Sequence, residues 1–332
     1  MKVGGSIMCT AIAKTLNDGR YYFGRNLDFN HPFGESLIIV PRNYEISLTN
    51  FDNIKHHPAI YGVGLIMDDF PMLFDCVNEN GLCFAGLNYP GNATFFDKKD
   101  GKNNIATFEL ALYLLSTFNK VKDVKAFLEN ANITNQMFSQ DVAPATLHYI
   151  FKDEDDCIVV EQDKDGLHIY DNPYGVLTNN PSFSWHALNI SNYMNISNKE
   201  GVNRILKDID VPRFGKAMGA LSLPGDSSPV SRFVKATFLL NNVDFFTDDI
   251  KNINQCFHIL NNVSTLIGES VMDDETREYT IYSSIYDLKN NKLYLKTYEN
   301  HQLSCLDINK FNLDDTSLLT FAINRQENIN NI

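Results

Sequence analysis

The sequence is short of positive charge. Lysine and arginine number 28 against 41 aspartate and glutamate residues, which gives a formal net charge of −13. Nucleic-acid binding requires clustered lysine and arginine, so this balance argues against a nucleic-acid partner. It argues equally against binding to an anionic membrane surface. If the ligand is itself an anion, a few local arginines must attract it against the field of the whole protein.

Long hydrophobic runs are also absent. The stretch FELALYLLSTF is too short to cross a membrane and contains Glu109. The first eight residues, MKVGGSIM, lack the apolar segment that a signal peptide needs. We therefore expect neither a membrane span nor secretion.

No CxxC motif or zinc-ligand spacing occurs, so we expect no metal site built on cysteines. The six cysteines are Cys9, Cys76, Cys83, Cys157, Cys256 and Cys305. Their wide scatter is typical of reduced thiols in a cytoplasmic protein, and the five after Cys9 are expected to be small buried hydrophobic residues. The acidic run 153–156 could hold a cation, but a solvated hairpin tip is favoured because no second ligand cluster is found.

No linker, repeat or low-complexity block divides the chain, which favours a single domain over residues 9–332. Short runs rich in β-branched and aromatic residues dominate the first third and predict strands. These runs are CTAIAKT, YYFGRNL, SLIIVPR, LIMDDFP and LCFAGLNY.

The period of the hydrophobic pattern changes after the first third. Helical spacing predicts helices over 107–118, with Thr107 as N-cap, and over 121–132. The expected elements that follow are strands at 146–153 and 157–162, helices at 230–240 and around 257–266, and a hairpin at 280–288 and 292–300. Strands adjacent in sequence usually pair antiparallel. The order therefore predicts an α+β fold, an αββα sandwich of two mainly antiparallel sheets between two helical layers.

Cys9 stands close to the start of the chain, which gives it a special chemical option. If residues 1–8 are removed, its α-amine becomes free and titrates near ~8. That amine can accept the thiol proton, so one residue supplies both nucleophile and base. The alternative is that Cys9 is merely the first residue of a buried strand.

Arg25 and Asp28 follow within the apolar run FGRNLD. Buried charges are costly unless they are paired. A guanidinium beside the thiol would lower the thiol pKa, and a carboxylate beside a new ammonium would hold it in place. The alternative is a structural ion pair at a strand end.

Asparagines at two strand-to-loop corners are further candidates. Asn88 precedes Tyr-Pro-Gly, and Asn179 lies in TNNP, where the proline pushes the backbone away from helix. Asparagine at such corners is usually turn chemistry, but it can also aim an N–H at a developing oxyanion. Arg232 lies near a helix start, after a Pro-Gly turn, and would otherwise be a surface residue.

Taken together, these pieces resemble the choloylglycine hydrolase family, which contains bile salt hydrolases and penicillin V acylases. The matching stretches occur in the family's order from Cys9 onward. They are MCTAI, FGRNLD, NENGLCFAGLNYPGNA, YGVLTNNPSF, LPGDSSPVSRFVKATF and YTIYSSIYDL. The resemblance implies an N-terminal nucleophile hydrolase that needs no cofactor and commonly forms tetramers.

The resemblance also implies roles for individual residues. Cys9 would be the nucleophile and its α-amine the base, with Arg25 and Asp28 as the charged pair beside it. Asn179, through its side chain, and Asn88, through its backbone N–H, would form the oxyanion hole. Arg232 matches the active-site arginine of the motif Ser-Arg-Phe.

The Ala-Gly-Leu-Asn segment that ends at Asn88 is similar to that of bile salt hydrolases, whereas penicillin V acylases usually carry tyrosine at this position. We therefore expect hydrolysis of the amide that joins a bile acid to glycine or taurine. The family's pocket positions fall on Leu27, Met67, Phe138 and Val142, all apolar as a steroid requires. Two alternatives remain, an acylase for penicillin V or another N-acyl amide, and a non-catalytic binder of amphipathic anions.

Family members generally begin at Met-Cys, whereas eight residues precede Cys9 here. Either Met8 is the true start, or residues 1–8 are a leader that is removed. With the leader attached there is no free α-amine, and the site is expected to be inactive.

Overall fold

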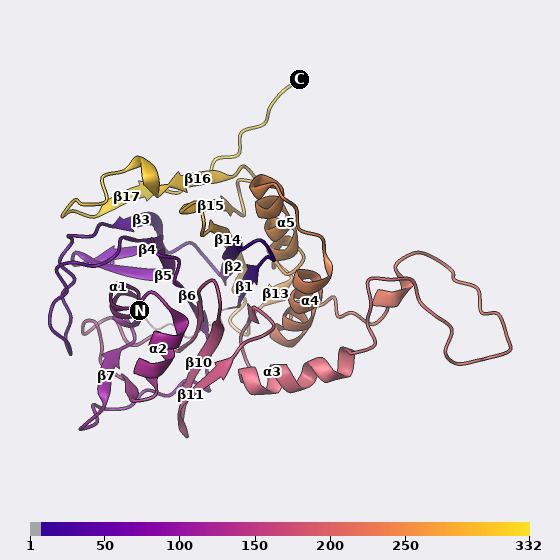
Figure 1. The fold of residues 1–332 in the computed structure, drawn as a ribbon, viewed down its shortest axis with the longest axis horizontal. Coiled ribbons are helices and arrows are strands. Elements are labelled where there is room, and N and C mark those ends of the chain that lie inside the picture. The colour runs from indigo at the N-terminus through magenta and orange to yellow at the C-terminus, as the bar shows by residue number, and fades with distance from the viewer. Residues whose placement is uncertain (1–7) are drawn as a thin grey trace.

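The structure is a computed structural model that describes residues 8–332. Of the predicted leader, residues 1–7 lie outside the described residues. Two antiparallel sheets lie face to face at the centre of the molecule (Figure 1). The first has the strand order β12-β1-β2-β14-β15-β16, with β13 paired to β14. Its strands are β1 (Cys9–Thr15), β2 (Tyr21–Phe29), β12 (Val176–Leu177), β13 (Ser270–Val271), β14 (Arg277–Asp287), β15 (Lys292–Thr297) and β16 (Ser304–Asp307).

The second sheet has the order β11-β10-β9-β6-β5-β4-β3-β17. Its strands are β3 (Ser36–Val40), β4 (Ile60–Met67), β5 (Phe70–Asn78), β6 (Cys83–Asn88), β9 (Leu147–Lys152), β10 (Cys157–Asp163), β11 (Gly166–Asp171) and β17 (Leu319–Ala322). β17 pairs antiparallel with β3, so a segment near the C-terminus closes one side of this sheet. A separate parallel pair joins β7 (Asn103–Ala106) to β8 (Ala131–Thr134).

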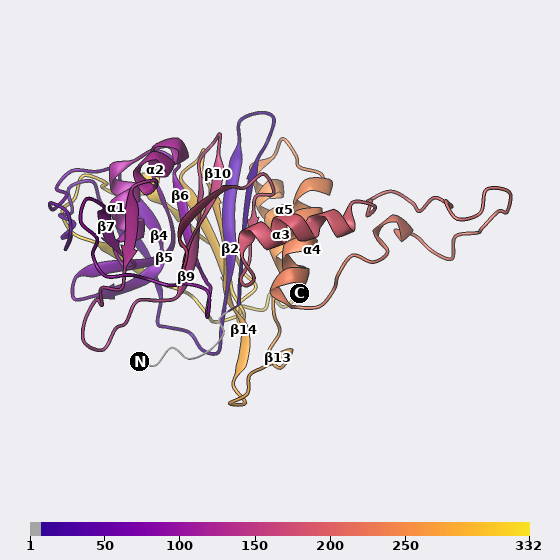
Figure 2. The same ribbon diagram turned by 90° about the horizontal axis from the view of Figure 1, so that it is seen from below.

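Helices cover the outer faces of both sheets (Figures 1 and 2). α1 (Leu110–Thr117) and α2 (Val121–Leu128) pack on the second sheet, and their buried leucines and valines share one core cluster with its strands. α4 (Pro229–Asn242) and α5 (Asp249–Asn261) pack on the first sheet. Both faces of β2 are therefore covered, and all nine of its residues are buried. The predicted αββα sandwich is confirmed.

A shorter helix, α3 (Phe183–Asn189), leads into η1 (Ile190–Tyr193), and neither was expected from the sequence. The remaining 3-10 helices are η2 (Met218–Ala220) and η3 (Ile308–Lys310). Between η1 and α4 the chain forms an arm, residues 194–228, that projects away from the sheets (Figure 2). The arm carries large apolar side chains that are mostly exposed, among them Ile205 at 90% and Phe214 at 85%.

Several local predictions were wrong. The helix expected around 257–266 is α5, which ends at Asn261, and the helix expected over 121–132 ends at Leu128. LIMDDFP is not one strand, because Asp68 and Asp69 adopt positive φ angles of 49° and 62° and form the turn between β4 and β5. Thr107 is not the N-cap, a position that Glu109 takes with its side chain bonded elsewhere. Cys305 is exposed, because it lies on the outward face of the end strand β16.

Candidate active site

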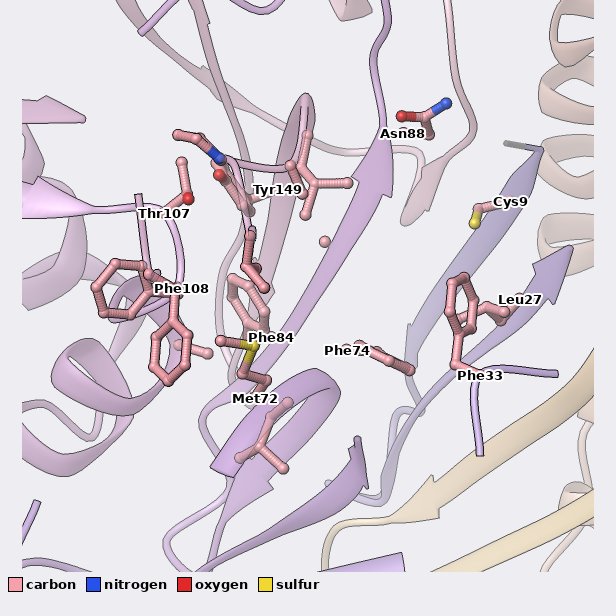
Figure 3. A pocket seen from close by; sticks show the side chains of 18 of the residues that line it. Cys9, Leu27, Phe33, Met72, Phe74, Phe84, Asn88, Thr107, Phe108 and Tyr149 are labelled. Carbon is pink, nitrogen blue, oxygen red and sulfur yellow. The ribbon is translucent and has the colours of Figure 1, made fainter. Parts of the chain in front are cut away.

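Cys9 is the first residue of β1 and lies at one side of a pocket (Figure 3). It pairs with Leu27 of β2, which lines the same pocket. Antiparallel partners project to the same face of a sheet, so the register brings these two side chains together. Only 1% of Cys9 is exposed, so its thiol is almost completely shielded from bulk water.

Arg25 is the closest charged partner of the Cys9 sulfur. Its Nη2 donates to Cys9 Sγ at 2.7 Å, while Nη1 donates to the carbonyl oxygens of Gly86 at 3.0 Å and Phe74 at 3.2 Å. The carboxylate of Asp75 lies 3.9 Å from Nη1. Arg25 is thus held by the second sheet while it points at the Cys9 sulfur, the candidate nucleophile, of the first.

The expected lowering effect of Arg25 on the thiol pKa is present, but it does not decide the net pKa. Burial raises the pKa of the Cys9 thiol above its ordinary value, and the Arg25 guanidinium opposes this without overcoming it. Desolvation therefore outweighs the nearby positive charge. A thiol in this state needs a base to remove its proton, rather than resting as a thiolate.

Asp28 approaches Cys9 from the other side of β2. Because it lies three residues after Arg25, its side chain points to the opposite face of the strand. Its N–H donates to the Met8 carbonyl at 3.1 Å, and its Oδ1 accepts from Thr280 Oγ1 at 2.7 Å. Within residues 8–332, Oδ2 has no hydrogen-bond partner. Burial raises the pKa of Asp28 to about 6, against the charge of Arg232.

A second buried carboxyl group, Glu278, was not foreseen. It lies on β14 with 2% of the residue exposed, and among the described residues its Oε2 has no hydrogen-bond partner. Burial, reinforced by the charge of Asp28, raises the pKa of Glu278 to about 7. Two acids with unsatisfied oxygens therefore flank the start of β1.

Asn179 and Arg232 hold the backbone of Cys9. Cys9 N–H donates to Asn179 Oδ1 at 2.8 Å, and Arg232 Nη2 donates to the same oxygen at 2.8 Å. Arg232 Nη1 donates to the Cys9 carbonyl and, at 2.6 Å, to Thr10 Oγ1. Arg232 lies in the first turn of α4, whose N-cap is Ser228. It is a buried residue rather than a surface one.

Asn88 presents its backbone to the same place. Tyr89 N–H bonds to Thr146 across the ladder with β9. Because hydrogen-bonded pairs alternate along an antiparallel ladder, the N–H and C=O of Asn88 point away from β9. The Asn88 carbonyl accepts from Asn179 Nδ2 at 2.8 Å, in agreement with this direction. The ladder between β5 and β6 ends at Ala85, which leaves this edge turned toward the site.

Two buried histidines position the loop that carries Asn179, and sequence reasoning missed both. His148 contacts Glu161 Oε1 at 2.9 Å and the Thr178 carbonyl at 2.9 Å. The two contacts hold the ring between Glu161 and the backbone of Thr178, next to Asn179. His186 Nε2 donates to the Asn179 carbonyl at 2.9 Å, and burial lowers the pKa of His186 to about 4, so this ring is neutral.

Asp75, which faces Arg25, was also missed. Three hydroxyl groups of β14 donate to its carboxylate, those of Tyr282 at 2.5 Å, Ser284 at 2.8 Å and Tyr286 at 2.8 Å. A signal was present, since Asp75 is an ionisable residue within the apolar run LFDCVN. Burying a charged side chain in such a run costs free energy unless hydrogen-bonding or charged partners surround it.

The pocket beside Cys9 is mostly apolar (Figure 3). Three of the four predicted pocket residues line it, namely Leu27, Phe138 and Val142. Met67 does not, because it is the last residue of β4, next to the turn, and Met72 of β5 lines the pocket instead. The aromatic part of the wall was missed, since it comes from scattered segments. Besides the predicted Phe138, it consists of Phe33, Phe74, Phe84, Phe108 and Tyr149.

Other candidate features can be placed directly. No group of three or more histidine, cysteine, aspartate or glutamate side chains within residues 8–332 is arranged to hold a metal ion. In the acidic turn 153–156, the Asp153 carboxylate accepts from backbone N–H groups, including that of Val121 at the start of α2. Among residues 8–332, no helix combines the length and the apolar character that crossing a membrane requires.

Comparison with known proteins gives consistent matches over almost the whole chain. The family model described as linear amide C–N hydrolases, choloylglycine hydrolase family, matches residues 9–321. A bile salt hydrolase/transferase from Lactiplantibacillus plantarum is 39% identical over 95% of this chain and 97% of its own length. A bile salt hydrolase/transferase from Clostridium perfringens is 37% identical over 98% of this chain and 100% of its own length.

Solved structures agree. A cysteine-to-alanine variant of the conjugated bile acid hydrolase from Clostridium perfringens superposes with a TM-score of 0.88, 35% identity and coverage of 98% of this chain and 99% of its own. Penicillin V acylase from Agrobacterium tumefaciens gives a TM-score of 0.77 at 20% identity, over 95% of this chain and 91% of its own, which shows a shared fold.

Proposed function

The chain belongs to the choloylglycine hydrolase family of linear amide C–N hydrolases, and on this premise we propose that it hydrolyses the amide of glycine- or taurine-conjugated bile salts. One observation carries the proposal. Arg25 donates to the Cys9 sulfur at 2.7 Å beside an apolar pocket, so a nucleophile and a steroid-compatible cavity share one place. The similarity to the two bile salt hydrolase/transferases described above supports bile salts as the substrate.

We propose that residues 1–8 are removed before the site becomes active. With Met8 attached, Cys9 N is an amide nitrogen and cannot act as a base. The family match begins at Cys9, which supports this boundary. On removal, the α-amine would remain within reach of Asn179 Oδ1, now 2.8 Å from Cys9 N. Oδ2 of Asp28, which has no hydrogen-bond partner among residues 8–332, would be a second acceptor for the ammonium.

The reaction then proceeds in two halves. The α-amine of Cys9 takes the thiol proton, and the sulfur attacks the amide carbonyl. Arg25 stabilises the sulfur anion, while the Asn179 side chain and the Asn88 backbone N–H bind the oxyanion. The ammonium protonates the leaving nitrogen, the C–N bond breaks, and a thioester links the bile acid to Cys9.

The second half reverses the roles of the same groups. Water gives a proton to the α-amine and attacks the thioester, and the C–S bond breaks. The free bile acid leaves, and the protonated amine returns its proton to the sulfur. Arg232 keeps the backbone of Cys9 fixed through its bonds to the Cys9 carbonyl and Asn179. The protein's own residues account for each proton, so the proposal includes no cofactor.

Incubation with glycocholate and taurocholate tests the proposal. We expect protein beginning at Cys9, verified by intact mass, to release free glycine or taurine. The Cys9→Ser variant should release neither at a comparable rate. Faster turnover of penicillin V, measured as kcat/KM on both substrate types, would favour the acylase alternative instead. Full activity in protein that still carries residues 1–8 would contradict the α-amine mechanism.

We further propose that the protein is a cytoplasmic homotetramer. The large apolar side chains exposed along the arm, residues 194–228, support assembly, since a partner subunit would remove them from water. We expect light scattering to give four times the chain mass. The paired variant Ile205→Glu with Phe214→Glu should give smaller species, whereas a Lys207→Glu control should not. A monomeric wild type would refute the assembly.

A further inference from the structure

Thr107 brings a hydroxyl group to the side of the apolar pocket across from Cys9 (Figure 3). Among the described residues of the wall, the other polar side chains are those of Cys9, Arg25, Asn88 and Tyr149. The first three lie at the end where the reaction is proposed. The Tyr149 side chain is completely buried, so its hydroxyl group is closed to a ligand. Thr107 thus offers a ligand a polar contact far from the scissile bond.

The hydroxyl group of Thr107 is accessible and unused. The residue is half-buried, and its Oγ1 forms no hydrogen bond within residues 8–332. In contrast to the Tyr149 oxygen, Oγ1 is not sealed inside the protein. An apolar ligand body that fills the pocket displaces the water that solvates such a group. The hydroxyl is then left unpaired, at a cost in free energy, unless the ligand supplies a partner.

The backbone at Thr107 is fixed between a strand and a helix. The preceding residue, Ala106, ends β7, and its carbonyl accepts from Glu109 N–H at 3.1 Å. Glu109 is the N-cap of α1, and its carboxylate accepts from Thr49 Oγ1 at 2.8 Å. Because Glu109 holds the N-cap position, the Thr107 hydroxyl is not consumed by the helix. The side chain therefore stands on a rigid turn with its hydroxyl group free for a ligand.

We propose that Thr107 determines substrate specificity, because its hydroxyl group forms a hydrogen bond with an oxygen at the end of the acyl group remote from the scissile amide. The ligand class is an amide whose acyl part has an apolar body and a hydroxyl or carbonyl oxygen at its far end. The inference rests on the proposed function, under which this oxygen is a ring hydroxyl of the bile acid. A steroid without that oxygen buries Thr107 unpaired, so the enzyme prefers hydroxylated steroid acids.

The test compares wild type with Thr107→Val on glycine conjugates of two cholanic acids, one with ring hydroxyls and one without. Valine has nearly the shape of threonine but cannot form the hydrogen bond. We expect a loss of about 5-fold in kcat/KM on the hydroxylated conjugate, the effect of one hydrogen bond between uncharged groups. On the unsubstituted conjugate we expect no loss, because the variant no longer buries an unpaired hydroxyl. Competitive inhibition by the two free acids should shift by the same ratio without any chemical step.

Two further variants separate the hydroxyl group from the shape of the side chain. Thr107→Ser keeps the hydroxyl and loses a methyl group, so it should keep the wild-type ratio of the two kcat/KM values. Thr237→Val is the matched control. Thr237 of α4 is also half-buried and its hydroxyl lacks a partner among the described residues, but it does not line the pocket. This variant should keep the ratio as well.

The outcomes distinguish the subsite from the proposed function. An unchanged ratio in Thr107→Val, or the same shift of the ratio in Thr237→Val, would overturn the subsite while leaving the proposed function intact. A valine-like ratio in Thr107→Ser would also overturn it, because the hydroxyl group would then not be the cause. If wild type cleaves neither conjugate, the proposed function fails and the subsite fails with it.

Discussion

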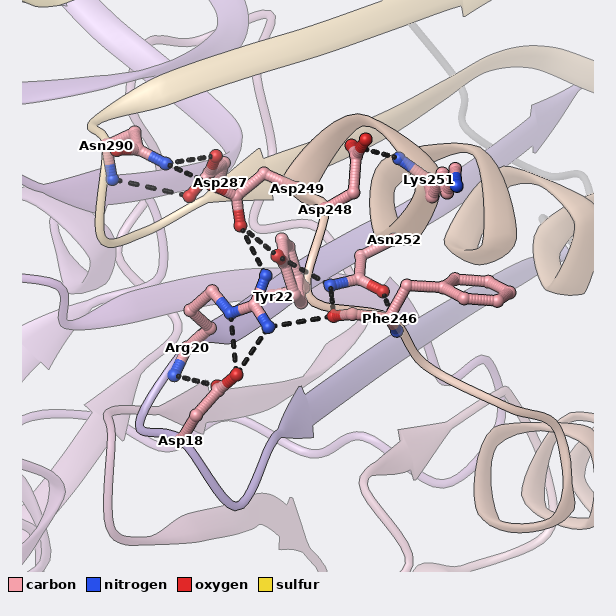
Figure 4. A network of polar contacts seen from close by, with 10 residues as sticks. All are labelled: Asp18, Arg20, Tyr22, Phe246, Asp248, Asp249, Lys251, Asn252, Asp287 and Asn290. Atoms are coloured by element: carbon pink, nitrogen blue, oxygen red, sulfur yellow. Dashed lines mark hydrogen bonds and ion pairs between the residues drawn. The ribbon is translucent and has the colours of Figure 1, made fainter.

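Two arginine-centred clusters, one partly exposed and one buried, lie toward opposite ends of β2, and they differ in how fully their polar atoms are used. At one end, Arg20 donates to Asp18, Asp249 and the Phe246 carbonyl, and Asn252 and Tyr22 complete the network (Figure 4). None of the side chains in Figure 4 has a buried polar atom without a partner among the described residues.

The cluster at the Cys9 end has the same kinds of residues but leaves atoms unused. Arg25 Nε, Asp28 Oδ2 and Glu278 Oε2 all lack partners within residues 8–332. A cluster whose polar atoms are all hydrogen-bonded stabilises the fold. A cluster with unused donors and acceptors costs stability, but those atoms can still form hydrogen bonds to a substrate or to a free α-amine at Cys9. The comparison predicts that substitutions at the Cys9 end of β2 affect turnover, whereas substitutions at the Arg20 end affect stability.

Replacing the nucleophile should have the largest effect. We expect Cys9→Ala to lower kcat by at least about 10⁴-fold, because the bond-forming atom is gone. Binding of the free bile acid should remain within about 2-fold, since the pocket wall is unchanged. Steady-state kinetics and calorimetric titration check both values. The control is Cys256→Ala, which changes another buried cysteine. A comparable loss of kcat in this variant would contradict the assignment of Cys9 as the nucleophile.

Asp75→Asn should have the next largest effect. The substitution removes the negative charge 3.9 Å from Arg25 and places amide hydrogens against the hydroxyl groups that now donate to it. We expect kcat to fall by about 10²-fold with KM nearly unchanged, since Asp75 positions Arg25 and lies outside the pocket wall. Ser284→Ala, which removes one of three donors, is the milder comparison. Equal kcat values for wild type and Asp75→Asn would exclude the positioning role.

A change in the satisfied cluster should affect folding alone. Asp249→Asn weakens the bonds from Arg20 and Tyr22, and we expect Tm to fall by about 5 °C. The value of kcat measured well below Tm should stay within about 2-fold. Scanning calorimetry and kinetics on the same preparation test this division. A kcat loss as large as that of Asp75→Asn would remove the distinction between the two ends.

Glu278 should give the smallest effect, visible as a dependence on pH. Its folded pKa of about 7 lies above the ordinary 4.5, so the folded state binds the extra proton. The stability that this proton contributes is complete below pH 4.5 and is lost as pH rises to about 7. We expect Glu278→Gln to reduce the fall of Tm over this window. Parallel Tm curves for the two proteins would show that Glu278 does not titrate there.

The candidate nucleophile and its immediate neighbours could be predicted because each lies in a short motif. FGRNLD, TNNP and SRF carry Arg25, Asp28, Asn179 and Arg232, and the structure brings all four around Cys9. The alternation of strand and helix segments along the chain, and with it the sandwich, followed from hydrophobic periodicity, since strand and helix periods differ.

The supporting groups could not be predicted, because their partners are distant in sequence. Asp75 meets Tyr282 and Tyr286 only when the two sheets pack, and His148 meets Thr178 across thirty residues. The net pKa of Cys9 depended on burial that no motif reveals. The place of Met67 depended on the turn at Asp68, which a reading of LIMDDFP as one strand had concealed.

The pairing of β17 with β3 has a practical consequence for handling this protein. Only four residues near the C-terminus, Leu319–Ala322, occupy the hydrogen-bonding groups of β3 on that side. A chain shortened before Leu319 would expose a bare template on which β3 strands of separate molecules could stack into insoluble aggregates. Purification tags should therefore be joined after Ala322. Limited proteolysis before Leu319 should make the solution turbid before the secondary structure is lost.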